Sequence, residues 1–281
     1  METTTKLKTF NYQEDGSISF SLLETIETTK TLKRGVYNIY TEYIGGQGYV
    51  TSISMLLNQE TYNINVPFYF KDKIDHIFEM FFNTDVKRRI KSLGYKHKLG
   101  VLLYGKQGTG KTSLIRNYFN NTVSCCDAIV FNITKVDYFN RTWDFIKDIR
   151  KIQDNPIVVF IDECDSFFPN QENEVKKALD GIDSIDNCIV LMATNYIDKI
   201  PDTIKNRPSR LKYIIEVEGI QEEFIIEDFL KESFNKIEVD FDYKKDLVKL
   251  KGSTLDELKE YVLNVIMNIE EESKKPKKLG F

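Results

Sequence analysis

The residues from Gly105 to Thr112 have the types and spacing of a phosphate-binding loop. They read Gly-Lys-Gln-Gly-Thr-Gly-Lys-Thr, follow the apolar run 101–104 and precede a segment typical of a helix, 113–119. Glycines allow a tight turn that brings backbone N–H groups against phosphate oxygens, and the helix start adds further free donors. Lys111 supplies a charge for the β- and γ-phosphates, while the Thr112 hydroxyl is a ligand for Mg²⁺. The predicted nucleotide-binding residues are Gly105, Lys106, Gln107, Gly108, Thr109, Gly110, Lys111, Thr112 and Ser113.

Polar side chains follow two later apolar runs. Asp162 and Glu163 come directly after 157–161, and Asn195 comes shortly after 189–192. Beside a phosphate loop, the first carboxylate is expected to organise Mg²⁺ together with Thr112, and Glu163 to polarise a water for attack on phosphate. An amide at Asn195 can hydrogen-bond that phosphate or water, although a turn-forming asparagine is the alternative. These residues predict a hydrolytic site.

Two arginines, Arg207 and Arg210, follow the short segment 201–206 and flank Pro208-Ser209. Their spacing is compatible with an exposed basic edge. One interpretation is an ordinary surface pair. The other is a pair offered to the nucleotide of a neighbouring subunit, which requires a head-to-tail contact and therefore a ring.

The elements that must position these residues are short apolar runs separated by helical patterns. The runs are 101–104, 128–133, 157–161, 189–192 and 213–217. Continuous β-branched runs are typical of parallel strands buried on both faces. The pattern predicts a three-layer α/β core with a five-stranded parallel sheet, in which ligands bind at the carboxyl ends of the strands.

The core is flanked by two regions of different character. Residues 1–70 alternate with period two, as in 36–43 and 49–56 around a glycine-rich turn, and predict a small N-terminal β-rich module. The module either packs on the core or recruits a partner. Residues 220–281 predict a C-terminal helical lid, whose last helix is capped by Ser253 or Thr254. The expected domains are thus 1–70, 71–219 and 220–281.

Composition limits the function classes. The chain has 281 residues, a net charge of −4 and four cysteines without metal-ligand spacing, of which Cys164 and Cys188 are expected to be buried. The start carries no secretory signal, and no apolar run reaches the ~20 residues of a membrane span, so we expect a reducing cytoplasm. The acidic balance disfavours nucleic-acid binding over the whole surface. The run 87–91 and the lysine-rich tail 274–278 keep a local polyanion contact open.

The ordered set of motifs resembles the AAA family of ATPases, within the AAA+ P-loop NTPases. It comprises GKQGTGKT, VVFIDECD, LDG at 179–181, IVLMATN and IPDTIKNRPSR. The resemblance implies ATP and Mg²⁺ as ligands. Lys111 and Thr112 match Walker A, Asp162 and Glu163 Walker B, Asn195 sensor 1, and Arg207 and Arg210 the arginine fingers. Because no arginine follows Arg210, the sensor 2 arginine of clamp loaders is absent. Gly252–Leu258 is similar to the lid-helix start of AAA proteins proper.

The family's pore loop is aromatic, apolar, then glycine. The nearest segment here is 136–140, where Tyr138 and Phe139 either grip an extended polypeptide or simply pack. The complete hydrolytic set, the paired arginines, the missing sensor 2 arginine and the acidic balance favour an ATP-hydrolysing homo-oligomeric ring, expected to be a hexamer, that remodels protein substrates. The alternatives are a nucleic-acid-associated loader or packaging factor, and a nucleotide-gated assembly scaffold.

Overall fold

A computed structural model describes residues 5–12, 18–26, 30–46, 48–56, 71–135, 137–180 and 183–274. The chain divides into two compact units, residues 1–33 and 34–281. The first unit contains β1 (Thr5–Tyr12) and β2 (Ile18–Ile26), which pair antiparallel. All candidate functional residues lie in the second unit.

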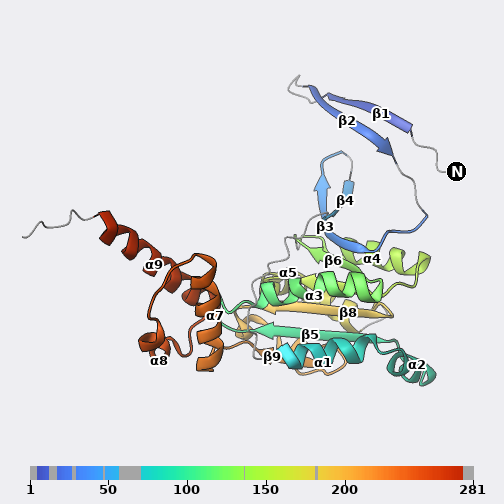
Figure 1. The fold of residues 1–281 in the computed structure, drawn as a ribbon. Coiled ribbons are helices and arrows are strands. Elements are labelled where there is room, and N and C mark those ends of the chain that lie inside the picture. Colours follow the sequence, from blue (N-terminus) through green and yellow to red (C-terminus); the bar gives the residue numbers. More distant parts are fainter. Residues whose placement is uncertain are drawn as a thin grey trace, which may run out of the picture. The chain divides into compact units, whose positions relative to one another are not determined.

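The second unit is built on a seven-stranded sheet of order β4-β3-β6-β7-β8-β5-β9 (Figure 1). The five predicted strands are present as β5 (Lys98–Tyr104), β6 (Ile129–Ile133), β7 (Ile157–Ile161), β8 (Cys188–Thr194) and β9 (Tyr213–Glu216). They pair parallel to one another, so the predicted α/β class is confirmed. Their carboxyl ends share one edge of the sheet.

The sheet has two more strands than the sequence predicts. β3 (Gly35–Ile44) pairs parallel with β6, and β4 (Gly48–Met55) pairs antiparallel with β3. The hairpin predicted within residues 1–70 therefore exists, but it extends the core sheet and does not belong to a separate N-terminal module. Alternation of polar and apolar residues indicates a half-buried hairpin without indicating which strand lies beside it. Of the rest of that prediction, residues 1–33 form a separate compact unit with β1 and β2, and residues 57–70 lie outside the described residues.

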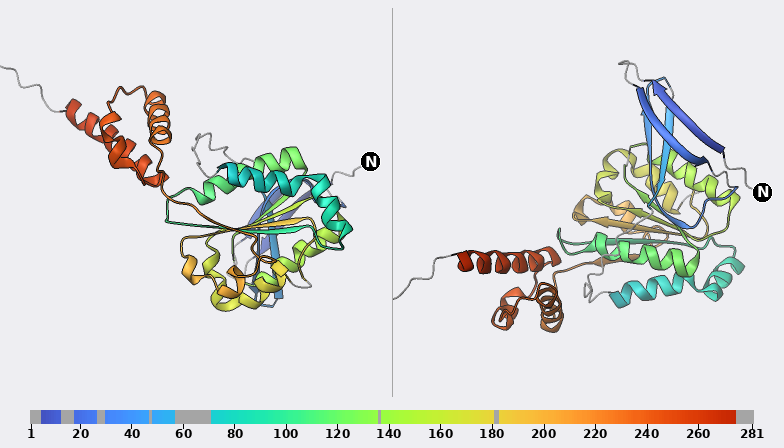
Figure 2. Two further views of the ribbon diagram at one scale, coloured as in Figure 1. Left: turned by 90° about the horizontal axis from the view of Figure 1, so that it is seen from below. Right: turned by 45° about the horizontal axis from the view of Figure 1, so that its top comes forward.

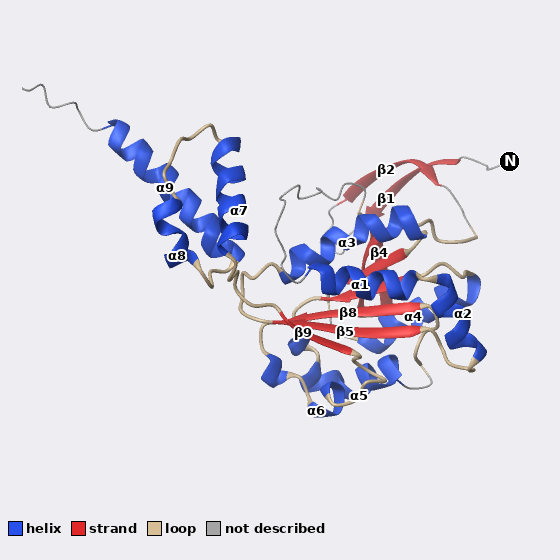
Figure 3. Ribbon diagram, turned by 60° about the horizontal axis from the view of Figure 1, so that its bottom comes forward, coloured by secondary structure: helices blue, strands red, loops and turns tan. Residues whose placement is uncertain are grey.

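Helices cover both faces of the sheet, which gives the predicted three layers (Figure 3). α1 and α3 lie on one face, and α4, α5 and α6 on the other. The bounds are α1 (Lys71–Phe82), α2 (Thr84–Ser92), α3 (Lys111–Cys126), α4 (Phe139–Ile152), α5 (Phe168–Asp180) and α6 (Asp202–Lys205).

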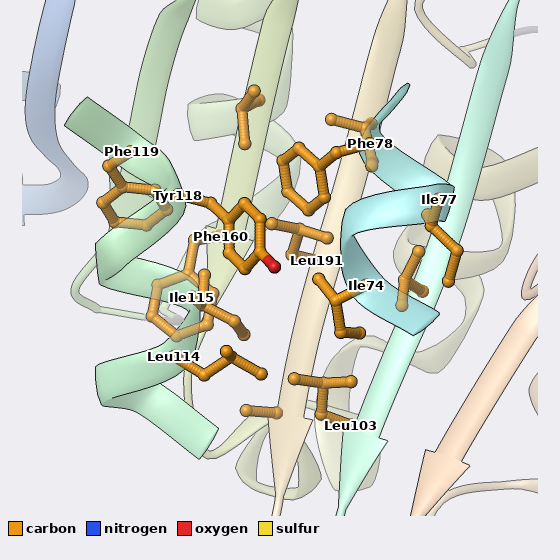
Figure 4. Packing of buried hydrophobic residues seen from close by; sticks show 14 of the residues in the cluster. Ile74, Ile77, Phe78, Leu103, Leu114, Ile115, Tyr118, Phe119, Phe160 and Leu191 are labelled. Carbon is orange, nitrogen blue, oxygen red and sulfur yellow. The ribbon is translucent and has the colours of Figure 1, made fainter. Parts of the chain in front are cut away.

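The layer between α1, α3 and the sheet is a continuous hydrophobic core (Figure 4). The rings of Phe78 on α1 and Tyr118 on α3 stack with centroids 4.5 Å apart, above Phe160 and Leu191 on the central strands. Each of the central strands also buries the side chains on its other face, because helices cover both sides. This packing fixes the strand ends that carry the candidate site.

Two further sequence expectations concern cysteines and membrane spans. Cys164 and Cys188 are buried as predicted, and burial raises the pKa of the Cys188 thiol to about 12. Both therefore act as small apolar groups. Among the described helices, none combines the length and apolarity needed to cross a bilayer.

The C-terminal residues form a helical subdomain with its own apolar cluster (Figure 2). Its helices are α7 (Glu223–Lys236), α8 (Leu247–Leu250) and α9 (Leu255–Lys274). Thr254 caps α9, since its hydroxyl accepts from the Glu257 N–H at 3.2 Å and its own N–H donates to the Glu257 carboxylate at 2.6 Å. This reciprocal pair fixes the start of α9, one of the two positions that the sequence indicated.

Gly100 is needed for the close approach of β5 to the segment that carries the arginines. A Cβ at Gly100 would lie 1.9 Å from the backbone oxygen of Arg210. We expect Gly100→Ala to lower the free energy of unfolding by about 1–3 kcal/mol, because the clash is with backbone and not with a movable side chain. Urea unfolding measures this. Gly45→Ala is the control, since its Cβ would meet nothing within 4 Å; equal losses in the two variants would contradict the prediction.

Candidate functional site

The phosphate loop connects the carboxyl end of β5 to the N-terminus of α3. Gly105, Gly108 and Gly110 have φ of 152°, 80° and 90°, a region that other residues rarely adopt. At Gly105 a Cβ would also lie 2.1 Å from the Val217 carbonyl oxygen. The glycines are thus required by the backbone path as well as by the approach of a phosphate.

Lys111 lies inside this loop. Its Nζ donates to the carbonyl oxygens of Gly105 and Lys106, both at 2.7 Å, and lies 3.3 Å from the Thr109 hydroxyl. Burial lowers the pKa of this ammonium, and the Asp162 carboxylate partly opposes that shift. Gly105, Lys106 and Thr109 therefore act on the predicted site by orienting Lys111.

We expect Lys111→Ala to raise the dissociation constant for ATP by roughly 100-fold. Hydrogen bonds from a charged group contribute ~1.5–3 kcal/mol each, and tenfold in affinity corresponds to about 1.4 kcal/mol. Titration with a fluorescent ATP analogue measures the change. Lys73→Ala is the control, because it removes an equal charge from an exposed position on α1, which carries no pocket residue. Similar affinity losses in both variants would contradict a specific role for Lys111.

Thr112 and Asp162 meet across the gap between α3 and β7. The Thr112 hydroxyl donates to Asp162 Oδ2 at 2.8 Å, and Asp162 Oδ1 accepts from the Glu163 N–H at 3.0 Å. A hydroxyl and a carboxylate at this separation are hard oxygen donors of the kind that Mg²⁺ takes, with waters and phosphate oxygens completing its octahedron. The residues present therefore fit the predicted magnesium site.

Glu163 and Asn195 lie at the ends of adjacent strands. Glu163 has a left-handed backbone, with φ of 46°, which is uncommon outside glycine. Its side chain is exposed, and among the described residues it has no hydrogen-bond or ion-pair partner. Thr194, just before Asn195, donates to Asp165 at 2.7 Å and accepts from the Tyr196 N–H at 2.9 Å. Asp165 thus anchors the end of β8. The Glu163 carboxylate, which has no such bond, is available for a water.

The carboxyl ends of the strands enclose a pocket of about 230 Å³. Its lining is Gln107, Gly108, Gly110, Lys111, Thr112, Ser113, Asp162, Glu163, Thr194, Asn195 and Asp256. The structure thereby brings together residues predicted from three separate motifs. Sequence reasoning did not assign Asp256, whose N–H donates to the Gly108 carbonyl at 3.1 Å. The available signal was its place in Gly252–Leu258, at the start of the last helix.

The two predicted arginines lie away from this pocket. The Lys98 ammonium, at the amino end of β5, donates to the Ser209 carbonyl at 3.0 Å, which holds the arginine segment at that end. From Lys98 to Tyr104 the strand spans roughly 20 Å at ~3.3 Å per residue. Arg207 is 60% exposed, whereas Arg210 is only 12% exposed. The expected exposed pair is therefore one exposed and one partly exposed arginine, because the Arg210 guanidinium turns inward to donate to the Thr203 carbonyl.

The remaining candidate segments are partly used for packing. Phe139 is buried, with its ring centroid 5.6 Å from that of Trp143, while the Tyr138 ring is partly exposed and lies 4.9 Å from that of Tyr49. Val136 lies outside the described residues. In the basic run, Lys91 pairs with Asp186 at 2.7 Å and Arg88 with Asp85 at 2.8 Å. Residues 275–278 of the lysine tail lie outside the described residues.

A family model describes the same region. Residues 101–219 match the model of the ATPase family associated with various cellular activities. The chain carries an AAA ATPase domain. The resemblance read from the motifs is thereby confirmed, and nucleotide binding follows from the domain.

Several curated proteins are similar to the AAA domain and its surroundings. Protein CdcH of Halobacterium salinarum is 32% identical over 152 residues, which are 50% of this chain and 20% of that protein. A 26S proteasome regulatory subunit 6B homologue of Encephalitozoon cuniculi is 33% identical over 149 residues, 47% of this chain and 38% of that protein. The 26S proteasome regulatory subunit 8 homologue A of Arabidopsis thaliana is 32% identical over 187 residues, 60% of this chain and 44% of that protein. The chain thus spans less than half the length of each of these relatives.

Proposed function

We propose that the chain hydrolyses ATP to ADP and phosphate. The observation that carries this proposal is the pocket in which Lys111, the Thr112–Asp162 pair and Glu163 converge. A nucleotide-binding switch needs only the first of these, whereas a hydrolase also needs a base beside the phosphate. In the AAA domain the candidate base is the exposed Glu163 carboxylate, which has no hydrogen-bond or ion-pair partner among the described residues.

Each residue then has one task. Lys111 and the loop N–H groups bind the β- and γ-phosphates, and Mg²⁺, when bound beside Thr112 and Asp162, neutralises charge on those phosphates. Glu163 accepts the proton of the water that attacks the γ-phosphate. Asn195 donates from its amide to that phosphate or orients the water. Asp256 extends from α9 to the loop, so the residues from 220 onward act as a lid whose position responds to occupancy of the pocket.

We further propose that the active unit is a homo-oligomeric ring, with a hexamer as the expected size. Arg207 belongs to the segment held at the amino end of β5, whereas the pocket lies at the carboxyl end of this strand, which is roughly 20 Å long. A guanidinium there can serve a phosphate only in the next subunit of a head-to-tail assembly. The 26S proteasome regulatory subunits among the relatives are, by name, parts of a larger assembly, which supports an oligomeric role.

The proposed work of the ring is remodelling of protein substrates. It is supported by the similarity to proteasome regulatory subunits and by the acidic balance of the chain. The test is capture of binding partners by Glu163→Gln protein held on ATP, compared with the same protein on ADP. Proteins enriched only with ATP would support the role. ATPase stimulation by DNA or RNA with a steep salt dependence, and no enriched protein, would favour the nucleic-acid alternative.

A further inference from the structure

The nucleotide pocket contains one carboxylate that the proposed hydrolysis does not use. Its charged lining residues are Lys111, Asp162, Glu163 and Asp256. Lys111 binds the phosphates, Asp162 belongs to the magnesium site, and Glu163 serves the attacking water. Asp256 takes part in none of these steps, and it comes from α9, whereas the other three belong to the α/β core. A ligand that carries phosphates therefore meets an additional negative charge in this pocket.

The Asp256 side chain lies against the phosphate loop itself. A Cβ built on Gly108 would lie 3.0 Å from both the Cβ and the Oδ2 of Asp256. The Asp256 N–H donates to the Gly108 carbonyl at 3.1 Å, which holds the backbone of α9 at the same point. The N–H groups of such a loop hold phosphate oxygens at about 2.9 Å. The carboxylate therefore lies within about 8 Å of the charge that the loop binds, a separation at which salt does not fully screen it.

The first turn of α9 is fixed by contacts on both sides of Asp256. Thr254 and Glu257 exchange the two hydrogen bonds of the helix cap. Just before the cap, Ser253 forms an isolated bridge with Ile220, whose N–H donates to the Ser253 carbonyl at 2.8 Å. These bonds tie the start of α9 to the segment that leads into the C-terminal helices. The Asp256 backbone therefore leaves the loop only if the whole start of α9 moves.

The alternative interpretation of Asp256 is an acid that stabilises the first turn of a helix. That role needs no contact with the phosphate loop. Glu257 already fulfils it, since its carboxylate accepts from the Thr254 N–H. Lys259 pairs with Asp256 at 3.1 Å, but the Asp256 side chain is 65% exposed and such exposed pairs are weak. Most of the negative charge of Asp256 therefore still acts on the loop.

We propose that Asp256 is a specificity-determining residue, whose carboxylate opposes the binding of a nucleoside triphosphate more than that of a diphosphate. Repulsion between like charges grows with the charge of the ligand, and ATP carries one phosphate more than ADP. Because Asp256 belongs to α9, ATP relieves the repulsion by displacing α9 from Gly108, whereas ADP leaves this contact in place. The inference rests on the proposed lid and gives its response a direction: the triphosphate moves the lid away from the loop.

The first test is Asp256→Asn, which keeps the shape of the side chain and the backbone contact with Gly108 but removes the charge. With Mg²⁺ present, ATP has about twice the net charge of ADP, so we expect the dissociation constant to fall roughly 10-fold for ATP and roughly threefold for ADP. Equilibrium titration measures both. Glu260→Gln is the matched control, because it removes an equal, exposed charge from α9 outside the pocket. Unchanged affinities, equal gains for the two nucleotides, or the same gains in Glu260→Gln would overturn the proposal.

Salt separates a charge effect from a change in packing. At 1 M KCl the Debye length is about 3 Å, so the difference between Asp256→Asn and the wild-type protein should largely disappear. A difference that persists at 1 M KCl would refute the repulsion. If Asp256→Asn does not fold, Asp256→Glu and Asp256→Gln provide a pair of equal length that differs in charge. The glutamine variant should bind ATP more tightly than the glutamate variant, and equal affinities would count against the assignment.

Hydrogen exchange tests the displacement of α9. The Asp256 N–H lies in the first turn of the helix, where it has no acceptor within α9, so its protection reports the contact with the Gly108 carbonyl. The non-hydrolysable analogue AMP-PNP should speed exchange at Asp256 in the wild-type protein but not in Asp256→Asn, and ADP should leave it slow in both. Equal exchange with the two nucleotides would overturn the proposal. Neither ligand is hydrolysed, so this result is independent of the proposed ATPase activity, which phosphate release tests separately.

Discussion

Glu163→Gln is expected to reduce ATP turnover by roughly a thousandfold while leaving the nucleotide bound. A positioned general base contributes roughly 10²–10⁴ in rate, and a glutamine amide cannot accept a proton at neutral pH. Affinity should persist, because the groups that hold the phosphates are Lys111 and the loop N–H groups. The carboxylate of Glu163 has no partner among the described residues, so its loss leaves no buried group unsatisfied.

Two measurements on the purified variant check this. Phosphate release gives the turnover, and equilibrium binding of an ATP analogue gives the affinity. Glu79→Gln is the control, because it removes an exposed carboxylate from α1, which carries no pocket residue. The Glu163→Gln protein, kept on ATP, should accumulate as an assembled ring in size-exclusion chromatography. Turnover near that of the wild-type protein would refute the hydrolytic site.

Arg207→Ala is also expected to lower ATP turnover by roughly a thousandfold. In this case the affected nucleotide site is that of the neighbouring subunit. An arginine delivered to a transferring phosphoryl group is worth roughly 10³–10⁵ in rate. Arg207 and the pocket of its own chain lie at opposite ends of β5, so in the proposed ring we expect the loss to arise where subunits meet. Affinity for ATP should change little. Turnover per subunit in the wild-type protein should also fall on dilution below the assembly concentration.

Arg210→Ala is expected to behave differently from Arg207→Ala. Arg210→Ala should lower the melting temperature as well as turnover, because Arg210 is 12% exposed and anchors the segment through the Thr203 carbonyl. Arg207 is 60% exposed, so Arg207→Ala should melt as the wild-type protein does. Lys212→Ala, which removes a nearby exposed charge, is the control for both. Dilution-independent turnover per subunit, or an Arg207→Ala enzyme of normal rate, would disprove the shared site.

The local parts of the site were predictable because their geometry is carried by consecutive residues. The loop from Gly105 to Thr112 specifies its own turn, and its glycines adopt the backbone angles that the motif requires. Asp162, Glu163 and Asn195 were predictable for a second reason. Parallel strands end at one edge, so residues that follow buried runs converge there without further information.

Other features depend on which distant segments pair. The alternating run that became β3 gave no indication that its neighbour is β6, more than ninety positions later in the sequence, because alternation specifies faces and not partners. Arg207 and Arg210 have the same residue type and nearly the same position, yet Arg207 is 60% exposed and Arg210 only 12%. Asp180 contacts both arginines, whereas the Thr203 carbonyl accepts from Arg210 alone, and only the packed chain brings these partners to them.

The sequence by itself determined the family, the α/β class and the phosphate loop with its acidic pair, since these follow from local motifs and strand ends. Tertiary structure alone decided three things: that β3 and β4 widen the sheet, that Asp256 reaches the pocket, and that Asp180 holds Arg207 at the opposite edge. The physical reason is the same in each case. A charge or a strand edge acts on whatever lies within a few ångströms, and that neighbour is set by the fold and not by the order of residues.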